Sequence, residues 1–229
     1  MSSTGLCRVA LLTALSATPL GCAFFGKSDP VVIRYFTPET VAAAPDPLGE
    51  ALAMPASEPG ARGLDLRMGR VNAASYLKDR IAFRDKNFEI GYYDELRWTE
   101  KPEAYLRRAL GRALFEAQGV RQIISGPGPT LDVDLDAFEE LRSPRHAARM
   151  QVTWMLSDDA RVQYEETFAI ERPIGSSEPS GPRGVATAMA QAFDESIKRI
   201  VARVMAALRS TASAVPPPPT ASGAPAGEK

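Results

Sequence analysis

The chain has 229 residues with 27 basic and 28 acidic side chains, which gives a formal net charge of −1. This balance lacks the basic surplus that binds nucleic acid or an anionic membrane surface, so we expect no nucleic-acid partner. The two cysteines, Cys7 and Cys22, and the single histidine, His146, provide little for a disulfide framework, a metal site or a nucleophile with its base.

The chain begins with a segment typical of a secretory signal peptide. Arg8 precedes a short apolar stretch, Val9 to Leu15, which is too short to span a bilayer. Pro19 then ends any helix, and small residues suited to cleavage follow. We therefore expect residues 1–21 to be a signal peptide that is removed together with Cys7.

Leu20-Gly21-Cys22 resembles the end of a bacterial lipobox, in which the cysteine becomes the lipid-modified first residue of the mature protein. Cys22 is therefore the candidate lipid-modified residue, carrying acyl chains such as palmitate. Ala23 after it is compatible with sorting to the outer membrane. Ordinary cleavage after Ala23 is the alternative, because Pro19 and Leu20 are atypical of a lipobox.

The folded domain is expected between residues 31 and 208. Residues 22–30 are predicted to form a tether, and the β-branched and aromatic residues of 31–36 predict a strand. Residues 39–62 are rich in proline and alanine and poor in large apolar groups, which predicts a loop. Apolar and polar residues then alternate over 64–71, which predicts a second strand.

A hairpin and a helix are predicted next. Residues 76–84 and 88–93 are strand-like and flank a turn-forming stretch. Thr99 is a candidate N-cap for a helix whose apolar stripe begins at Leu106 and which ends at Gly119. The stripe contains several alanines, which suits close packing of this helix on a sheet.

More strands and a long helix complete the prediction. A short strand is expected at 120–124 and a longer one from Leu131, with an irregularity near Ala137 and three carboxylates on its outer face: Asp132, Asp134 and Asp136. Residues 148–156 and 162–170 alternate in the same way and predict a hairpin. From Val185 to Leu208 apolar residues recur at every third or fourth position, which predicts an amphipathic helix. Residues 209–229 include a proline run and are expected to be disordered.

Strands outnumber helices in this prediction, and each helix needs a sheet face against which to bury its apolar stripe. We therefore expect an α+β fold. It would be a two-layer sandwich, in which a largely antiparallel or mixed β-sheet carries the two amphipathic helices on one face.

Three segments carry a family resemblance: Tyr76 to Arg84, Gly91 to Trp98 and Pro102 to Leu110. In their order, behind a lipoprotein signal, they resemble the ABC-type transport auxiliary lipoprotein family over residues 31–208. The resemblance implies a non-catalytic periplasmic domain, lipid-anchored at the periplasmic face of the outer membrane. The resemblance also implies that the protein associates with an MCE-domain protein and its ABC permease and ATPase. Such a system moves lipids or other hydrophobic molecules across the cell envelope. The sequence is also compatible with a homo-oligomer.

No motif in the sequence predicts catalysis, a cofactor or a metal site. His146 is more typical of a solvated loop residue than of a catalytic base. The aspartates from Asp132 to Asp136 resemble the start of a calcium loop, but Ala137 replaces the required glycine and Ser143 the bidentate glutamate. Gly126-Pro127-Gly128 lacks the backbone donors of a phosphate-binding loop.

Two surface features are weighed as recognition sites. The pair Arg97-Trp98 is more typical of core filling by the tryptophan, and the face formed by Arg107, Arg108 and Arg112 is more typical of a solvated helix.

An alternative function is a lipid- or glycolipid-binding carrier or assembly lipoprotein of the envelope. Its groove between sheet and helices would be lined by Met150, Trp154, Met189 and Met205, residues that are also typical of an ordinary core.

Overall fold

The computed structural model of the chain describes residues 31–39, 63–86, 88–175 and 181–214. The expected signal peptide, the tether up to residue 30, the predicted loop at 40–62 and the end of the tail from residue 215 lie outside these residues, as does Cys22. All helices and strands among the described residues belong to one compact unit.

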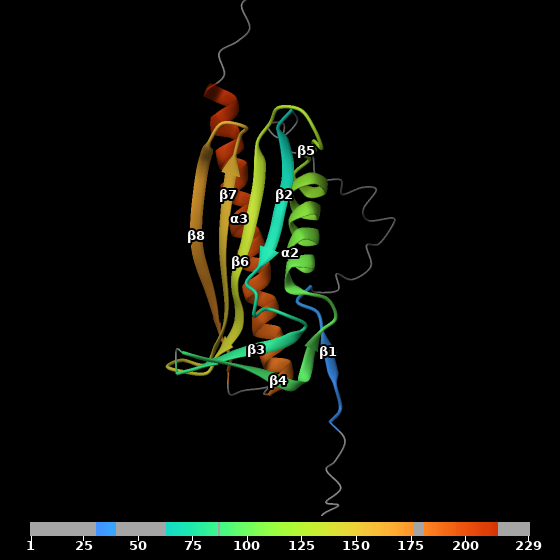
Figure 1. Cartoon of the computed structure of the whole chain (residues 1–229), viewed down its shortest axis with the longest axis vertical. Coiled ribbons are helices and arrows are strands. Elements are labelled where there is room, and N and C mark those ends of the chain that lie inside the picture. Colours follow the sequence, from blue (N-terminus) through green and yellow to red (C-terminus); the bar gives the residue numbers. More distant parts are fainter. Residues whose placement is uncertain (1–30, 40–62, 87, 176–180, 215–229) are drawn as a thin grey trace, which may run out of the picture. The chain divides into compact units, whose positions relative to one another are not determined.

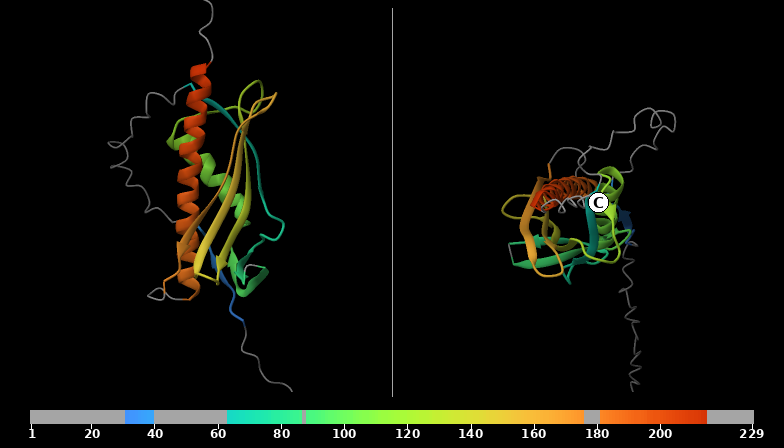
Figure 2. Two further views of the ribbon diagram at one scale, coloured as in Figure 1. Left: turned by 90° about the vertical axis from the view of Figure 1, so that its left-hand side faces the viewer. Right: turned by 90° about the horizontal axis from the view of Figure 1, so that it is seen from above.

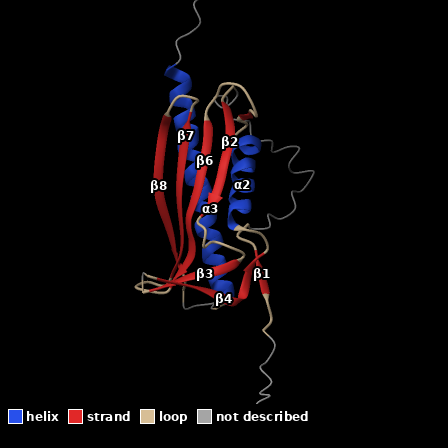
Figure 3. Cartoon of the chain, in the orientation of Figure 1, coloured by secondary structure: helices blue, strands red, loops and turns tan. Residues whose placement is uncertain are grey.

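The described residues form a mixed sheet and two helices (Figures 1 and 3). The strands are β1 (Arg34–Phe36), β2 (Asp65–Ala73), β3 (Arg80–Asp85), β4 (Glu89–Trp98), β5 (Arg121–Gln122), β6 (Thr130–Leu141), β7 (Ala147–Ser157) and β8 (Val162–Pro173). The helices are α2 (Pro102–Gly111), continued by the π-helical turn η1 (Arg112–Ala117), and α3 (Pro182–Ala214).

β6 is the central strand of the sheet. It pairs antiparallel with β7, and β7 pairs antiparallel with β8, which forms the predicted hairpin. Along its other edge, β6 pairs parallel first with β2 and then with β3. β3 and β4 form the second predicted hairpin, while β1 joins β4 and β5 joins β2 through parallel pairs.

The helices cover the sheet. α3 contacts β6, β7 and β8, whereas α2 contacts β2 and α3 (Figure 2). The core between the layers consists of fully buried aliphatic side chains, among them Leu66, Leu106, Leu131, Met150 and Ile200. Burial of each such side chain contributes about 1.5–3 kcal/mol, so packing holds this domain together. The arrangement confirms the predicted α+β fold.

A β-bulge lies in the middle of β6. Leu135 pairs with Val152 and Ala137 with Gln151, so Asp136 is an extra residue on the β6 side. Because of it, Leu135 and Phe138 are both buried in the core although three positions separate them. The irregularity predicted near Ala137 is confirmed.

α3 buries the predicted apolar stripe from Val185 to Leu208. The helix does not end there, however, because it continues to Ala214. The prediction of a disordered tail is therefore wrong for residues 209–214. Two polar contacts hold these last turns on β8: the Tyr164 hydroxyl lies 2.6 Å from Ser210 Oγ, and the Thr211 hydroxyl donates to Gln163 Oε1 at 3.2 Å.

The start of α2 also differs from the prediction. Lys101 is the N-cap, without a side-chain hydrogen bond, and Pro102 occupies the first helical turn. Thr99 is thus not the cap, because its hydroxyl is paired with the Tyr105 hydroxyl instead. Gly119, with φ of 68°, follows η1 in the left-handed conformation that ends helices, as predicted.

Candidate functional site

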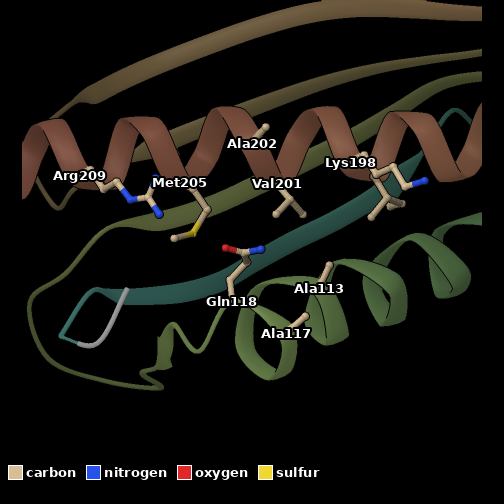
Figure 4. A pocket seen from close by; sticks show the side chains of 9 residues that line it. Ala113, Ala117, Gln118, Lys198, Val201, Ala202, Met205 and Arg209 are labelled. Atoms are coloured by element: carbon tan, nitrogen blue, oxygen red, sulfur yellow. The ribbon is translucent and has the colours of Figure 1, made fainter. Parts of the chain in front are cut away.

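A groove runs between η1 and α3 on the surface of the helical layer (Figure 4). It encloses about 430 Å³ and is lined on the α3 side by Ile197, Val201 and Met205. On the opposite side stand Ala113 and Ala117, whose short side chains leave the space open. The floor of the groove is apolar.

The rim of this groove is polar. Lys198 and Arg209 border it from α3, and Gln118 projects toward Met205 from the end of η1 (Figure 4). Lys198 Nζ pairs with Asp194 Oδ2 at 2.6 Å. The volume falls in the usual range of small-ligand sites, and the combination of an apolar floor with cationic ends suits an anionic amphiphile.

A second cavity of about 540 Å³ adjoins the groove and shares Ala113, Ala117 and Ile197 with it. Glu39 stands at its edge and accepts hydrogen bonds from Arg108, at 3.2 Å, and Arg112, at 2.7 Å.

The arginine face formed by α2 and the start of η1 is therefore engaged within the chain. Arg108 also pairs with Glu100 at 2.8 Å, and Arg107 donates to the carbonyl oxygen of Gly69 at 2.9 Å. The hydrogen bonds that Arg108 donates to Glu39 raise the pKa of Arg108 above its ordinary value. All three arginines are exposed, in agreement with the predicted solvated helix face.

Two adjacent glutamates of β6 are buried, which the sequence analysis missed. Glu139 is fully buried and accepts two hydrogen bonds from Arg84: Nε to Oε1 at 2.6 Å and Nη2 to Oε2 at 3.0 Å. The Tyr76 hydroxyl donates to the same Oε2 at 3.0 Å, and burial together with Glu139 raises the tyrosine pKa. This cluster fastens β3 and the segment before it to β6.

Glu140 forms a separate cluster. The Tyr93 hydroxyl donates to its Oε2 at 2.6 Å, and His146 Nε2 lies 2.6 Å from its Oε1. Arg142 Nε donates to Oε2 at 3.4 Å and stacks over the Phe83 ring. The side chain of His146 is 47% exposed, as predicted for a loop residue, but its carboxylate partner was not foreseen.

The predicted carboxylate row does not converge on a cation site. Each aspartate is bonded to a neighbouring strand: Asp132 accepts from Arg70 N at 2.6 Å, Asp134 from Asn72 at 3.1 Å and Asp136 from Thr153 at 2.7 Å. Within the described residues no cluster of three metal-ligating side chains occurs.

The tryptophan of Arg97-Trp98 fills the core. Trp98 is 2% exposed and stacks on Phe138 with ring centroids 5.0 Å apart. Arg97 Nη1 donates a hydrogen bond to the carbonyl oxygen of Tyr93 at 3.0 Å. Arg97 Nε also forms an ion pair with Asp79 Oδ2 at 3.7 Å. The reading of Trp98 as core filling is confirmed.

The four residues predicted to line a lipid groove are not brought together. Met150 and Met189 are fully buried in the core, and Trp154 borders a separate cavity of about 280 Å³ beside β8. Met205 alone among them lines the groove between η1 and α3. The residues with short side chains, Ala113 and Ala117, create this groove, and nothing in their spacing distinguishes a groove from close helix packing.

The predicted lipid-modified residue, Cys22, lies outside the described residues. Among the described helices none combines the length and apolar character needed to cross a bilayer.

Comparison with known proteins identifies one family. The family model for the ABC-type transport auxiliary lipoprotein component matches residues 48–201. A crystal structure of a Xanthomonas campestris protein is similar with a TM-score of 0.63 at 21% identity, covering 79% of this chain and 99% of that one. The crystal structure of an uncharacterized protein has a TM-score of 0.51 at 16% identity, covering 61% and 91%. These two likenesses support the fold. No curated protein matches the sequence closely enough to count as a relative.

Proposed function

Since the chain belongs to the ABC-type transport auxiliary lipoprotein family, we propose that it is a non-catalytic accessory subunit of an ABC/MCE-type transport system. The system would move lipids or other hydrophobic molecules across the cell envelope. The observation that carries the proposal is the match of the family model over residues 48–201, more than half of the chain. The protein is lipid-anchored at the periplasmic face of the outer membrane.

The anchor is Cys22. Gly21 before it and Ala23 after it suit lipid modification and sorting to the outer membrane. A diacylglycerol on the thiol and an acyl chain such as palmitate on the new amino terminus supply more than one chain, and attachment by two or more chains is stable. The residues that follow then act as a tether for the domain.

The role of the domain is to position a partner. It engages the MCE-domain protein, with its ABC permease and ATPase, while the lipid fixes the place of contact at the membrane. The polar clusters of β6 support a non-catalytic role: Glu139 and Glu140 are each bonded to an arginine and a tyrosine, and these contacts fasten strands to one another.

Co-purification tests the docking. Envelope proteins are cross-linked in cells that express the wild type or the Cys22→Ala variant, and the accessory protein is isolated in detergent. We expect the MCE-domain protein to accompany the wild type and to be depleted with the variant. Absence of the MCE-domain protein from the wild-type sample, even after cross-linking, would sink the proposal.

Acyl labelling tests the anchor. Cells fed a labelled fatty acid should label the wild type and the Cys7→Ala variant, because Cys7 leaves with the signal peptide. The Cys22→Ala variant should carry no label. Equal labelling of the Cys22→Ala variant would contradict lipid modification at this residue.

The groove between η1 and α3 favours a second candidate, a carrier that binds lipid or glycolipid directly. Its apolar floor, with Val201 and Met205, and its cationic rim, with Lys198 and Arg209, fit an acyl chain and an anionic head group. Native mass spectrometry of the detergent-free soluble domain, produced without the signal peptide and Cys22, should then detect a bound lipid that the Ala113→Leu variant loses, because the larger side chain fills the groove. Consistent absence of lipid from the wild type would dismiss this candidate.

A further inference from the structure

The segment that leads into the domain exposes large apolar side chains. Val32 is 72% exposed, Ile33 47% and Tyr35 64%. Within the described residues, β1 pairs only with β4, so one edge of the strand is open. An exposed apolar stretch on an open strand edge is usually covered in the working protein, because it otherwise promotes aggregation.

The distance to the membrane limits what can cover it. If Cys22 carries the lipid, as the proposed function holds, Val32 follows the anchor by ten residues, which span at most about 36 Å when fully extended. Val32 therefore stays within about 36 Å of the anchor whatever path the chain takes, a range that includes direct contact with the bilayer. A lipid surface is thus the covering surface that this tether keeps within reach.

The composition of the stretch suits the boundary between lipid and water. Valine and isoleucine supply apolar area, and Tyr35 combines an apolar ring with a hydroxyl, as interfacial aromatic residues do. Arg34 lies between them, half-buried, with its guanidinium over the Phe36 ring, and its positive charge is of the sign that lipid phosphates attract.

A second exposed apolar residue lies at the same end of the domain. Phe88, in the turn between β3 and β4, is 91% exposed and follows the exposed Lys86 closely. β4 connects this turn to the residues that pair with β1, Leu96 to Trp98. Figures 1 and 2 both place β1 and the β3–β4 hairpin at one end, with the C-terminal end of α3 at the other.

We propose that Val32, Ile33 and Tyr35 of the β1 segment, together with Phe88 of the β3–β4 turn, contact the lipid surface in which Cys22 is anchored. Two separate contacts joined by the rigid hairpin fix the orientation of the domain. The turn between β7 and β8 and the end of α3 then face away from the membrane.

Site-specific fluorescence tests the orientation. The acylated protein has no free thiol, since its one cysteine carries the lipid, so Ile33→Cys, Phe88→Cys and Asp159→Cys each introduce a single labelling site for an environment-sensitive dye. The labelled proteins are reconstituted in phosphatidylethanolamine and phosphatidylglycerol vesicles that contain a lipid with a quencher at the top of the acyl chain. We expect a loss of fluorescence at positions 33 and 88 but not at 159, in the β7–β8 turn.

Matched substitutions separate a contact from mere proximity. In the protein labelled at position 88, Ile33→Ser should weaken the quenching about threefold or more, because it removes apolar area from the interface. Val162→Ser makes a similar change at a residue of similar exposure, 49% against 47%, at the other end of the domain, and should leave quenching unchanged. Both sites are exposed, so folding is not at risk.

The outcomes are distinguishable. Protein that fails to float with the vesicles contradicts the anchor and, with it, this contact. Protein that floats but shows equal quenching at 33, 88 and 159, or none, retains the anchor and overturns the contact. A loss of MCE-partner binding by Ile33→Ser with no change in quenching would also overturn it, since the strand would then bind protein rather than lipid.

Discussion

Removal of Arg84 should destabilise the domain more than removal of any exposed arginine. Glu139 is fully buried, and in the Arg84→Ala variant it keeps the hydrogen bond from Tyr76 but loses both hydrogen bonds from the guanidinium. Breaking a buried pair from one side costs about 3–5 kcal/mol, because a charge stays in the interior without its partner. This is a large part of the roughly 5–15 kcal/mol that stabilises a typical domain.

Urea unfolding followed by tryptophan fluorescence measures this loss, since Trp98 is buried against Phe138. The control is Arg70→Ala on β2, whose guanidinium is largely exposed and lies 3.8 Å from Asp132. Such a surface pair contributes at most about 1 kcal/mol. Both variants remove one arginine from a strand, so their difference isolates the effect of burial.

A double variant completes the test. Arg84→Met together with Glu139→Leu replaces both charges by apolar groups and should recover most of the lost stability. The Tyr76 hydroxyl keeps an acceptor in that variant, the carbonyl oxygen of Asp136 at 3.2 Å. If Arg84→Ala costs no more than Arg70→Ala, the reasoning from burial is refuted.

Two further predictions concern acid stability and close packing. Hydrogen bonding from Arg199, at 2.7 Å, lowers the pKa of Glu166, so the stability that this contact gives is complete above about pH 4.5 and is lost as the pH falls through the lowered folded-state pKa. Glu166→Gln should therefore flatten the decline of the urea midpoint between about pH 5 and 3; an unchanged decline would assign it to other carboxylates. A Cβ at Gly91 would lie 2.3 Å from Cζ of Phe83, whose ring is held between Tyr93 and Arg142, so Gly91→Ala should cost about 1–3 kcal/mol. Gly111→Ala, where a Cβ meets nothing within 4 Å, should gain about 0.5–1 kcal/mol, and equal effects at the two glycines would contradict this account of Gly91.

Local patterns predicted the elements whose residues face one continuous apolar surface. The stripe from Val185 to Leu208 and the alternation in β7 and β8 each show the period of their structure, and all three elements are present. The bulge near Ala137 was also visible, because two apolar residues three positions apart break an otherwise strict alternation.

The errors have a common cause in side-chain contacts that the local pattern of residues does not reveal. Glu139 and Glu140 follow a strand pattern without any sign of burial, and their partners Arg84 and Tyr93 lie about fifty residues earlier. Thr99 is a residue type that is favoured at N-caps, but its hydroxyl is paired with the hydroxyl of Tyr105, six residues later in the chain. Residues 209–214 are too polar to predict a helix, and contacts with β8 hold them in one.

The groove between η1 and α3 was hidden from the sequence for a different reason. Alanines at helical spacing indicate close packing when the facing helix is near and an open groove when it is farther away. The distance between the helices is set by the whole sheet beneath them, which no local pattern of residues encodes.

The extra residue at Asp136 gives β6 one residue that its ladder with β7 does not need. Deleting this one residue would remove the bulge and leave a regular alternation, in which Leu135 and Phe138 still share the core face. Deleting Asp136 and Ala137 together would instead exchange the faces of everything that follows, turning Phe138 to the outside and Glu139 into the apolar core. The bulge therefore lets this position lose one residue but not two, and a relative without Asp136 would keep its core with a straighter strand.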